Sequence, residues 1–450
     1  MAKKTKSSIP AGSMSFPIVN PNAAGIDIGD LLIAVAVPQD RDTQPVREFG
    51  AFTEDLFNIA SWLRQCRVDS VAMECTGVYW KNLYAVLVEQ GFSVCLANSR
   101  HTQNVTGRKT DMSDAQRIQQ LHSCGFLSSS FLPDDATQIL RTLVRQRRAI
   151  TQDSTRYILR MQKALELMNI KLHAVISDIT GKTGSAILSA ILGGERNPDK
   201  LLLLVEKGIK ADPETLRKSL QANWREEYLF LLKQSHETYL HLQSQKVSYD
   251  MQIERVIDNF QKEIPIAEIP PVAPDKKKAK HRKQPAMDTR KYLHAILGVD
   301  VVAIPGISEI SALEILSETG TDLSKWPSRN HFVSWLNLCP NNKISGGKLI
   351  SSQMLRKKPN AAASAFRIAA NSMCRSKSWL GDYFRRMKAK GGQKHAIVAT
   401  GRKLAIIYYE MVTGGKEYKP LDNLEYKLMN RRRRITHLEK LLKQLKKEVA

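Results

Sequence analysis

Residues 25–38, GIDIGDLLIAVAVP, predict the start of a β-sheet. GIDIG and LLIAVAVP are short apolar runs separated by a tight polar turn, which is typical of two adjoining strands. Further apolar runs then alternate with segments of helical spacing. The additional elements predicted are strands at 46–52, 68–75 and 92–98 and helices at 55–66 and about 79–90. This alternation indicates an α/β domain with a mixed central sheet.

Four acidic residues associated with these elements form the first candidate site. Asp27 lies in the first strand and Glu74 ends the run at 68–75, so parallel pairing would bring both carboxylates to neighbouring strand ends. Asp111 and Asp114 are three residues apart and share one face of a predicted helix. Taken singly, Asp111 could be a helix N-cap, and GIDIG also begins sugar-kinase-type ATPase domains. The combined order of the four residues is much more specific.

The chain is strongly basic. Its 68 Lys and Arg against 44 Asp and Glu give a formal charge of +24 and a pI near 9.7, which favours nucleic acid as the partner. With 450 residues and 42% hydrophobic content, it is long enough for two or three domains with cores. Carboxylates clustered in such a chain predict Mg²⁺ or Mn²⁺ as cofactor, because their oxygens are hard ligands. Two such ions about 4 Å apart would suit chemistry on phosphodiesters.

A second candidate site lies in the segment NLCPNNKISGGKLISS. Ser345 precedes Gly346 and Gly347, which permit close approach of the backbone to a bulky substrate. Lys343 and Lys348 could hold a phosphate, and a hydroxyl beside a phosphate can act as a nucleophile. The ordinary alternative is that a serine before two glycines is just a turn.

Two further segments are candidate contacts to nucleic acid. The segment AIPGISEISALEILSETG resembles a helix-hairpin-helix, in which Pro305 and Gly306 would expose backbone N–H groups to a phosphate. The alternative is a plain pair of helices in a core. Lys109 ends the basic loop SRHTQNVTGRK and is the remaining candidate.

The rest of the chain predicts a helical organisation. Apolar residues recur at helical spacing from about 136 to 172 and again from Asp212 to about Phe260, which indicates either an antiparallel coiled-coil arm or an ordinary bundle. We expect a basic flexible leader at 1–22, an α/β domain at 23–133, the arm at 134–263, a Pro- and Lys-rich linker at 264–291, a mainly α domain with the serine at 292–418, and a basic helical tail at 419–450.

Features of secreted, zinc-binding and membrane proteins are missing from the sequence. The six cysteines have no CxxC pair or zinc-type spacing. The first residues carry no apolar signal segment, and no run of about 18 apolar residues occurs. We therefore expect a soluble, cytoplasmic protein with no membrane partner.

The motifs together resemble the IS110 family of insertion-sequence transposases. The matching segments run in family order over about residues 24–412 and are GIDIGD, MECTGVYWKNLYAVLVEQGFSV, GRKTDMSDAQRIQQL, SDITGKTGSAILSAILGGERNP, IPGISEISALEILSETG and SWLNLCPNNKISGGK. The Lys-rich linker and the basic helix from Arg431 onward depart from the family pattern.

This resemblance implies a fold, a reaction and partners. The amino-terminal domain would be RuvC-like (RNase H-like), with Asp27, Glu74, Asp111 and Asp114 holding the divalent metal. Ser345 would attack a DNA phosphate and form a covalent phosphoserine link. The family also implies a homo-oligomer, dimer or tetramer, assembled on the donor, target and element-end DNA and guided by a noncoding bridge RNA. The absence of a GxxxxGK[ST] phosphate loop agrees with strand exchange that needs no ATP.

Two other functions remain open at this point. A RuvC-like junction-resolving endonuclease would hydrolyse DNA with metal-bound water and would not need Ser345. A nucleic-acid-binding protein with an inactive nuclease fold would need none of the four carboxylates, although all four are present.

Overall fold

The computed structural model divides into two compact units, Met1–Leu132 and Pro133–Ala450. The residues it describes are 17–74, 77–97, 111–206, 208–263, 285, 287–354 and 360–449. Lys109 lies outside these ranges, and Asp111 is described by its backbone alone. The predicted division into six segments stays a proposal.

The first unit is built on a five-stranded sheet of order β3-β2-β1-β4-β5. Its strands are β1 (Ala23–Ile28), β2 (Leu32–Ala36), β3 (Val46–Gly50), β4 (Ser70–Glu74) and β5 (Ser93–Ala97). The hairpin strands β1, β2 and β3 pair antiparallel, whereas β4 pairs parallel with both β1 and β5. The predicted mixed sheet is therefore confirmed.

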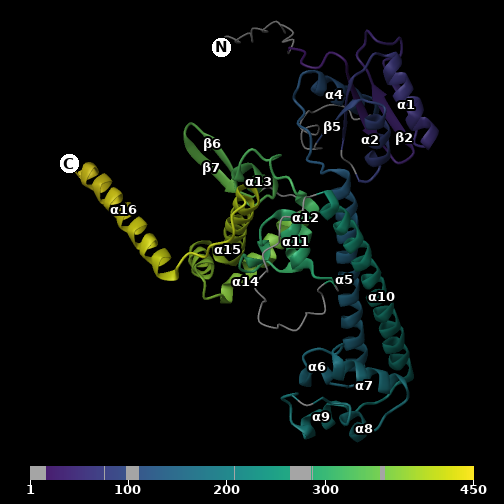
Figure 1. Cartoon of the computed structure of the whole chain (residues 1–450), viewed down its shortest axis with the longest axis vertical. Coiled ribbons are helices and arrows are strands. Elements are labelled where there is room, and N and C mark those ends of the chain that lie inside the picture. The colour runs from purple at the N-terminus through teal and green to yellow at the C-terminus, as the bar shows by residue number, and fades with distance from the viewer. Residues whose placement is uncertain are drawn as a thin grey trace, which may run out of the picture. The chain divides into compact units, whose positions relative to one another are not determined.

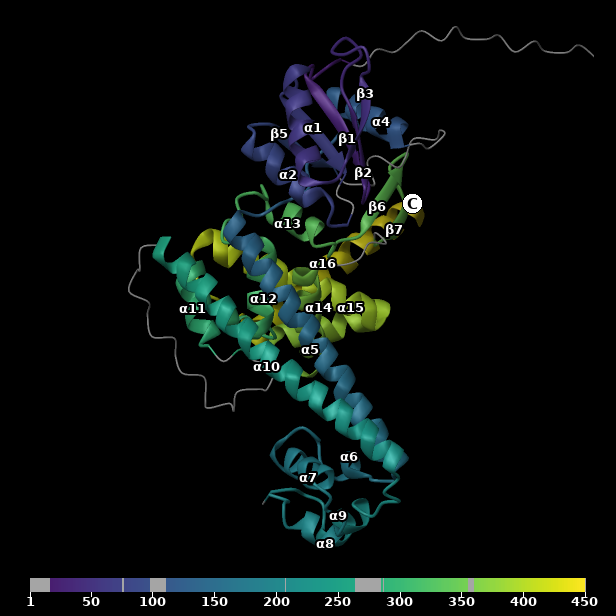
Figure 2. The ribbon, with the colours of Figure 1, turned by 90° about the vertical axis from the view of Figure 1, so that its right-hand side faces the viewer.

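Helices cover both faces of this sheet. Helices α1 (Thr53–Gln65) and α2 (Trp80–Glu89) lie on one face and α4 (Asp111–Ser123) lies on the other (Figure 2). The α1 and α2 face contains the large apolar core, which includes Ile26 and Met73. The α4 face is lined by small residues such as Ala34 and Ala36, packed against Ala115 of the helix. Small side chains let α4 approach the strands closely.

The second unit contains a long helical arm. Helices α5 (Asp135–Leu167) and α10 (Glu226–Glu263) lie side by side along their length (Figure 1, Figure 2). Arg147 forms a buried ion pair with Asp250, and the Gln243 amide donates to Ser154 Oγ at 3.2 Å. The partner numbers fall on α10 as they rise on α5, so the two helices are antiparallel.

The end of the arm carries a small folded tip. Its helices are α6 (Leu172–Val175), α7 (Lys182–Leu192), α8 (Pro198–Leu202) and α9 (Pro213–Ser219). They share an apolar core with the adjoining ends of α5 and α10. The second long helix therefore begins at Glu226 and not after Asp212 as predicted, because Asp212 caps the short helix α9.

The remainder of the second unit is mainly helical, as predicted. Its elements are α11 (Thr289–Leu297), η1 (Val301–Ala303), α12 (Glu309–Thr319), α13 (Arg329–Trp335), β6 (Asn341–Ser345), β7 (Lys348–Gln353), α14 (Ala361–Ser372), η2 (Met373–Arg375), α15 (Trp379–Gly414) and α16 (Asn423–Val449). Phe332, Phe366 and Tyr408 form an aromatic cluster among α13, α14 and α15. Arg145 of α5 pairs with the buried Glu318 carboxylate of α12, which joins the arm to this body. Within the described ranges, no helix is long and apolar enough to cross a membrane.

Candidate active site and nucleic-acid interface

Asp27 and Glu74 lie at the carboxyl ends of neighbouring strands. The parallel register pairs Ile26 of β1 with Met73 of β4, so the next residues along the two strands are adjacent. Ile26 and Met73 both face the core beneath α1 and α2. Since successive side chains of a strand alternate between faces, Asp27 and Glu74 point to the opposite face, which α4 covers. Both side chains are half-buried.

Helix α4 runs antiparallel to β1 and β4. Near its end, Gln119 Nε2 donates to the carbonyl of Ala23 at 3.3 Å, and His122 Nε2 is hydrogen bonded to Ser70 Oγ at 2.7 Å. Ala23 and Ser70 are the first residues of their strands. The amino-terminal end of α4 therefore lies toward the carboxyl ends of the same strands, where Asp27 and Glu74 are found.

The other two acidic residues are in the first turn of α4. Asp111 begins the helix, and the half-buried Asp114 forms an ion pair with Arg117 at 3.4 Å. A helix amino-terminus carries partial positive charge, which stabilises carboxylates placed there. The structure thus brings Asp27, Glu74 and Asp114 to one end of the sheet and places the backbone of Asp111 beside them.

Glycine at position 25 sets the distance between α4 and the sheet. A Cβ added at Gly25 would lie 2.2 Å from the Gln119 amide nitrogen and 2.4 Å from the Ala115 carbonyl oxygen. Only a residue without a side chain allows this contact. Sequence reasoning gave Gly25 no role, because its partner lies some 90 positions further along the chain.

The chemistry of this donor set fits a hard divalent cation. All four candidate ligands are carboxylates, the groups that Mg²⁺ and Mn²⁺ prefer. Among the side chains that the structure describes, no group of three or more His, Cys, Asp or Glu is close enough to hold a metal ion. The Asp111 side chain is not among those described.

Ser345 lies at the tip of an exposed hairpin. It ends β6 and pairs across the turn with Lys348, the first residue of β7. Gly346 and Gly347 form the turn with φ of +54° and +74°, the backbone that two-residue hairpins of type I′ require. Lys343, Ser345 and Lys348 are all exposed. The glycines are thus explained by the turn, while the serine hydroxyl and both lysines remain accessible.

The Pro305-Gly306 turn packs closely on a neighbouring helix. Gly306 has φ of +87°, and an added Cβ would lie 2.7 Å from the Ala369 carbonyl oxygen of α14. Ser308 caps α12 by accepting from the Ser311 amide at 3.2 Å. The turn therefore has a structural role in joining α12 to α14. Its role as a contact to phosphate stays a prediction.

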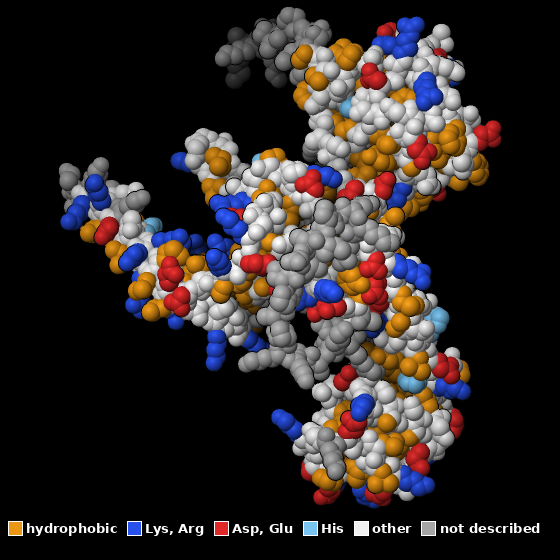
Figure 3. All heavy atoms as spheres, viewed as in Figure 1, with side chains coloured by type: hydrophobic (Ala, Val, Ile, Leu, Met, Phe, Trp, Pro, Cys, Tyr) orange, Lys and Arg blue, Asp and Glu red, His pale blue; other side chains and the backbone are white. Residues whose placement is uncertain are grey.

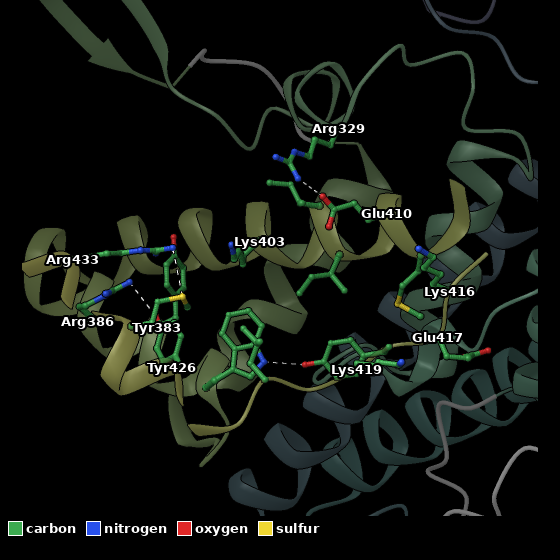
Figure 4. A pocket seen from close by; sticks show the side chains of 17 residues that line it. Arg329, Tyr383, Arg386, Lys403, Glu410, Lys416, Glu417, Lys419, Tyr426 and Arg433 are labelled. Carbon is green, nitrogen blue, oxygen red and sulfur yellow. Dashed lines mark hydrogen bonds and ion pairs between the residues drawn. The ribbon is translucent and has the colours of Figure 1, made fainter. Parts of the chain in front are cut away.

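A basic pocket of about 420 Å³ lies among α13, α15, α16 and the loop between the last two helices (Figure 4). Six cationic residues line it, namely Arg329, Arg386, Lys403, Lys416, Lys419 and Arg433, with Glu410 and Glu417 as the acidic ones. Arg329 is paired with Glu410. Lys403, Lys416 and Lys419 have no ion-pair partner among the described residues. Arg329 comes from α13 and the other lining residues from 379–433, so the pocket depends on how α15 and α16 fold back on each other, which the sequence pattern does not show.

Aromatic side chains give the pocket a second property. The Arg386 guanidinium lies 5.5 Å from the ring centroid of Tyr383 and 5.7 Å from that of Tyr426, and it donates to Tyr426 Oη at 3.0 Å. Burial raises the pKa of Tyr383 above its ordinary value. Cations beside aromatic faces can bind phosphates and stack against bases.

Two family models match segments of this chain. A family model for DEDD transposases of the IS110 type matches residues 24–170, which include all four carboxylates. A second model, described as Transposase IS116/IS110/IS902 family, matches residues 301–385, which include Ser345. Both models describe transposases, and together they span just over half of the chain, so the protein is a DNA transposase enzyme. The chain belongs to the IS110 family. No curated protein matches it significantly.

Proposed function

We propose that this transposase cuts and rejoins DNA strands at the ends of an insertion sequence through a covalent phosphoserine intermediate. The observation that carries the proposal is the antiparallel run of α4 over β1 and β4, which gathers the acidic residues at one end of the sheet. We further propose that this domain is RuvC-like, in keeping with its five-stranded mixed sheet.

In this proposal Asp27, Glu74, Asp111 and Asp114 hold Mg²⁺ or Mn²⁺. When bound, the metal would neutralise charge that develops on the phosphate oxygens. The carboxylates would fix its position. Membership of the DEDD family suggests dependence on a divalent metal.

Ser345 is the proposed nucleophile. Its Oγ forms a bond to a DNA phosphorus as the bond to one strand oxygen breaks, and the serine proton ends on the departing hydroxyl. A hydroxyl of another strand then reverses the step, displacing Ser345 and taking over the phosphate. One phosphodiester is exchanged for another, so no external energy source is needed. Lys343 and Lys348, exposed on the same hairpin, would attract the phosphate.

Nucleic acid would be held mainly through its backbone. The charge of +24 and the unpaired lysines of the basic pocket support binding of DNA and of a noncoding guide RNA. We also propose that a noncoding RNA guides the protein and that several subunits assemble on the DNA. Phosphate contacts would come from Lys109, Lys343, Lys348 and the 305–306 turn. Base pairing between the guide RNA and the DNA would then select the DNA sequence.

The proposal is tested by searching for a protein–DNA adduct. Labelled element-end DNA is incubated with the protein, the flanking noncoding RNA and Mg²⁺, then run on a denaturing gel. We expect an adduct that Ser345→Ala removes and that Ser351→Ala, a change on the opposite strand of the same hairpin, leaves intact. Cleavage without an adduct, unaffected by Ser345→Ala, would instead establish a metal-dependent junction nuclease.

The metal site is tested separately. We expect Asp27→Asn, Glu74→Gln, Asp111→Asn and Asp114→Asn each to abolish cleavage while DNA and RNA binding persist, because neutral side chains cannot offset the metal charge. Unchanged cleavage in two or more of these variants would refute the carboxylate assignment.

A further inference from the structure

Arg367, on α14, is a half-buried arginine with no carboxylate beside it. Burial lowers the pKa of its guanidinium, and no Asp or Glu of the described ranges pairs with it. Arg47 and Arg290 are also half-buried, but they pair with Asp42 and Asp300 at 2.8 and 2.6 Å. Taking a cation out of water without a counter-charge costs free energy. The surroundings of Arg367 therefore indicate a site for an anion.

Arg367 is hydrogen bonded to the segment just before the Ser345 hairpin. Its Nη2 donates to the carbonyl oxygen of Asn337 at 3.0 Å, close to the end of α13. A helix carboxyl-terminus carries partial negative charge, so a cation is favourable there. This contact uses one of the several N–H donors of the guanidinium, and Nε is buried without a partner among the described residues. Donors are thus left for a ligand, and their planar arrangement fits phosphate oxygens.

The segment around Arg367 is almost free of acidic residues. Residues 323–409 contain 17 Lys and Arg but one acidic residue, Asp382, whereas the whole chain has 44 Asp and Glu in 450 residues. Asp382 itself pairs with Arg385. The segment includes α13, the Ser345 hairpin, α14 and most of α15, and Lys and Arg side chains gather on the visible face of α15 (Figure 3). Such a depletion of carboxylates suits a polyanion such as nucleic acid.

Arg367 lies at the border between the buried and the exposed sides of α14. Ala363 and Ala370, on one side of it, are buried, whereas Ile368 and Asn371, on the other, are exposed. An arginine at such a border packs its aliphatic stem on the core and keeps the end of its guanidinium at the surface. A ligand in solution can therefore reach it.

We propose that Arg367 binds a backbone phosphate of the DNA strand that Ser345 attacks, several nucleotides from the scissile phosphate. That the strand is DNA rests on the proposed function. From Asn341 to Ser345, β6 spans about 13 Å at about 3.3 Å per residue, a length of about four base pairs. Because Arg367 holds the chain at Asn337, just before β6, its phosphate would set the register of the strand against the serine.

The salt dependence of DNA binding tests this contact in the full chain. Affinity for element-end duplex DNA is measured without metal at several salt concentrations for the wild type, Arg367→Gln and Arg47→Gln. Arg47 is the matched control, because its Nε is likewise buried without a partner among the described residues but Asp42 already neutralises its charge. We expect the slope of log affinity against log salt to fall by about 0.9 for Arg367→Gln and to stay unchanged for Arg47→Gln.

A purely structural role for Arg367 predicts a different result. Glutamine can still donate to the Asn337 carbonyl, so the slope for Arg367→Gln would then not change, and that outcome would overturn the proposal, as would an equal fall for both variants. Arg367→Lys keeps the charge and should keep the wild-type slope, whereas a fall as large as that of Arg367→Gln would contradict binding through the charge. With the noncoding RNA in place of DNA we expect no change, and a fall for RNA alone would assign Arg367 to RNA.

A scan with uncharged linkages locates the phosphate. Single methylphosphonates are placed along each strand of the element-end DNA, and affinity is measured for the wild type and Arg367→Gln. We expect the wild type to lose affinity at a linkage of the cleaved strand several nucleotides from the cleavage site, and the variant to lose nothing further there. Equal losses for both proteins at every linkage would overturn the proposal. Both experiments measure binding without cleavage, so their failure would leave the proposed recombination unaffected.

Discussion

Gly25→Ala should disable the proposed metal site without touching a carboxylate. The new Cβ would lie 2.4 Å from the Ala115 carbonyl oxygen, whereas ordinary contact begins at 3.4 Å. Helix α4 must therefore retreat by about 1 Å, carrying Asp111 and Asp114 away from the strands. A displacement of about 1 Å in a catalytic group can lower the rate about 100-fold. Overpacking of this kind also costs about 1–3 kcal/mol of stability.

The assay is single-turnover cleavage of element-end DNA, with thermal unfolding and DNA binding measured on the same preparation. We expect a folded variant that binds DNA and cleaves it about 100-fold more slowly. Gly414→Ala is the matched control, because a Cβ there has nothing within 4 Å. Wild-type cleavage by Gly25→Ala would refute the claim that the close approach of α4 positions the site.

Three further outcomes are expected. Arg147→Met should destabilise the arm by about 3–5 kcal/mol, because the buried Asp250 carboxylate loses its partner; chemical denaturation measures this, and recovery is expected with the additional change Asp250→Leu. Burial lowers the pKa of His122, so the unfolded chain binds a proton more readily than the folded one. The contribution of neutral His122 to the free energy of unfolding is therefore complete above the ordinary histidine pKa of about 6.5, and it declines as the pH falls below that value. His122→Gln should make urea unfolding less dependent on pH between about 5 and 7, and an unchanged profile would exclude this histidine as the cause. Lys403 and Lys419 of the basic pocket can both be replaced by Gln, and affinity for duplex DNA measured against salt concentration. We expect the slope of log affinity against log salt to fall by about 0.9 for each phosphate that is no longer neutralised. An unchanged slope would mean that the phosphates bind elsewhere.

The sequence predicts the first unit well because its signals are local. Alternating apolar runs and helical spacing are enough to place the strands, and the β1–β4 pairing that brings Asp27 and Glu74 together is present. The direction of α4 was not predictable in the same way. It depends on contacts such as that between Gln119 and Ala23, which join residues far apart in the chain.

The second unit departs from prediction where tertiary packing overrides helical spacing. The expected long helix breaks between α9 and α10, where Leu220 is buried in the core of the tip. Trp224 there adopts φ of +45°, a rare backbone for a residue with a side chain, and the Arg196 guanidinium lies 4.8 Å from its ring. Helical periodicity continues through this segment and does not reveal the break.

The sequence around Ser345 indicates the turn of the hairpin but not its two strands. Two consecutive glycines between short runs are typical of a two-residue hairpin turn. The flanking segments, NNKIS and KLISSQ, lack the strong apolar alternation of a half-buried strand. The structure agrees with that composition, because almost all of the hairpin is exposed.

The antiparallel arm also fixes a distance. Helix α5 has 33 residues, which at 1.5 Å per residue gives a rod of about 50 Å. The buried Arg147–Asp250 pair resists sliding of one helix along the other, so this length stays constant. A rod of that length matches about 15 base pairs of duplex at 3.4 Å each. The arm therefore holds its tip at a constant distance from the body at its base, a distance equal to about one and a half turns of a DNA duplex.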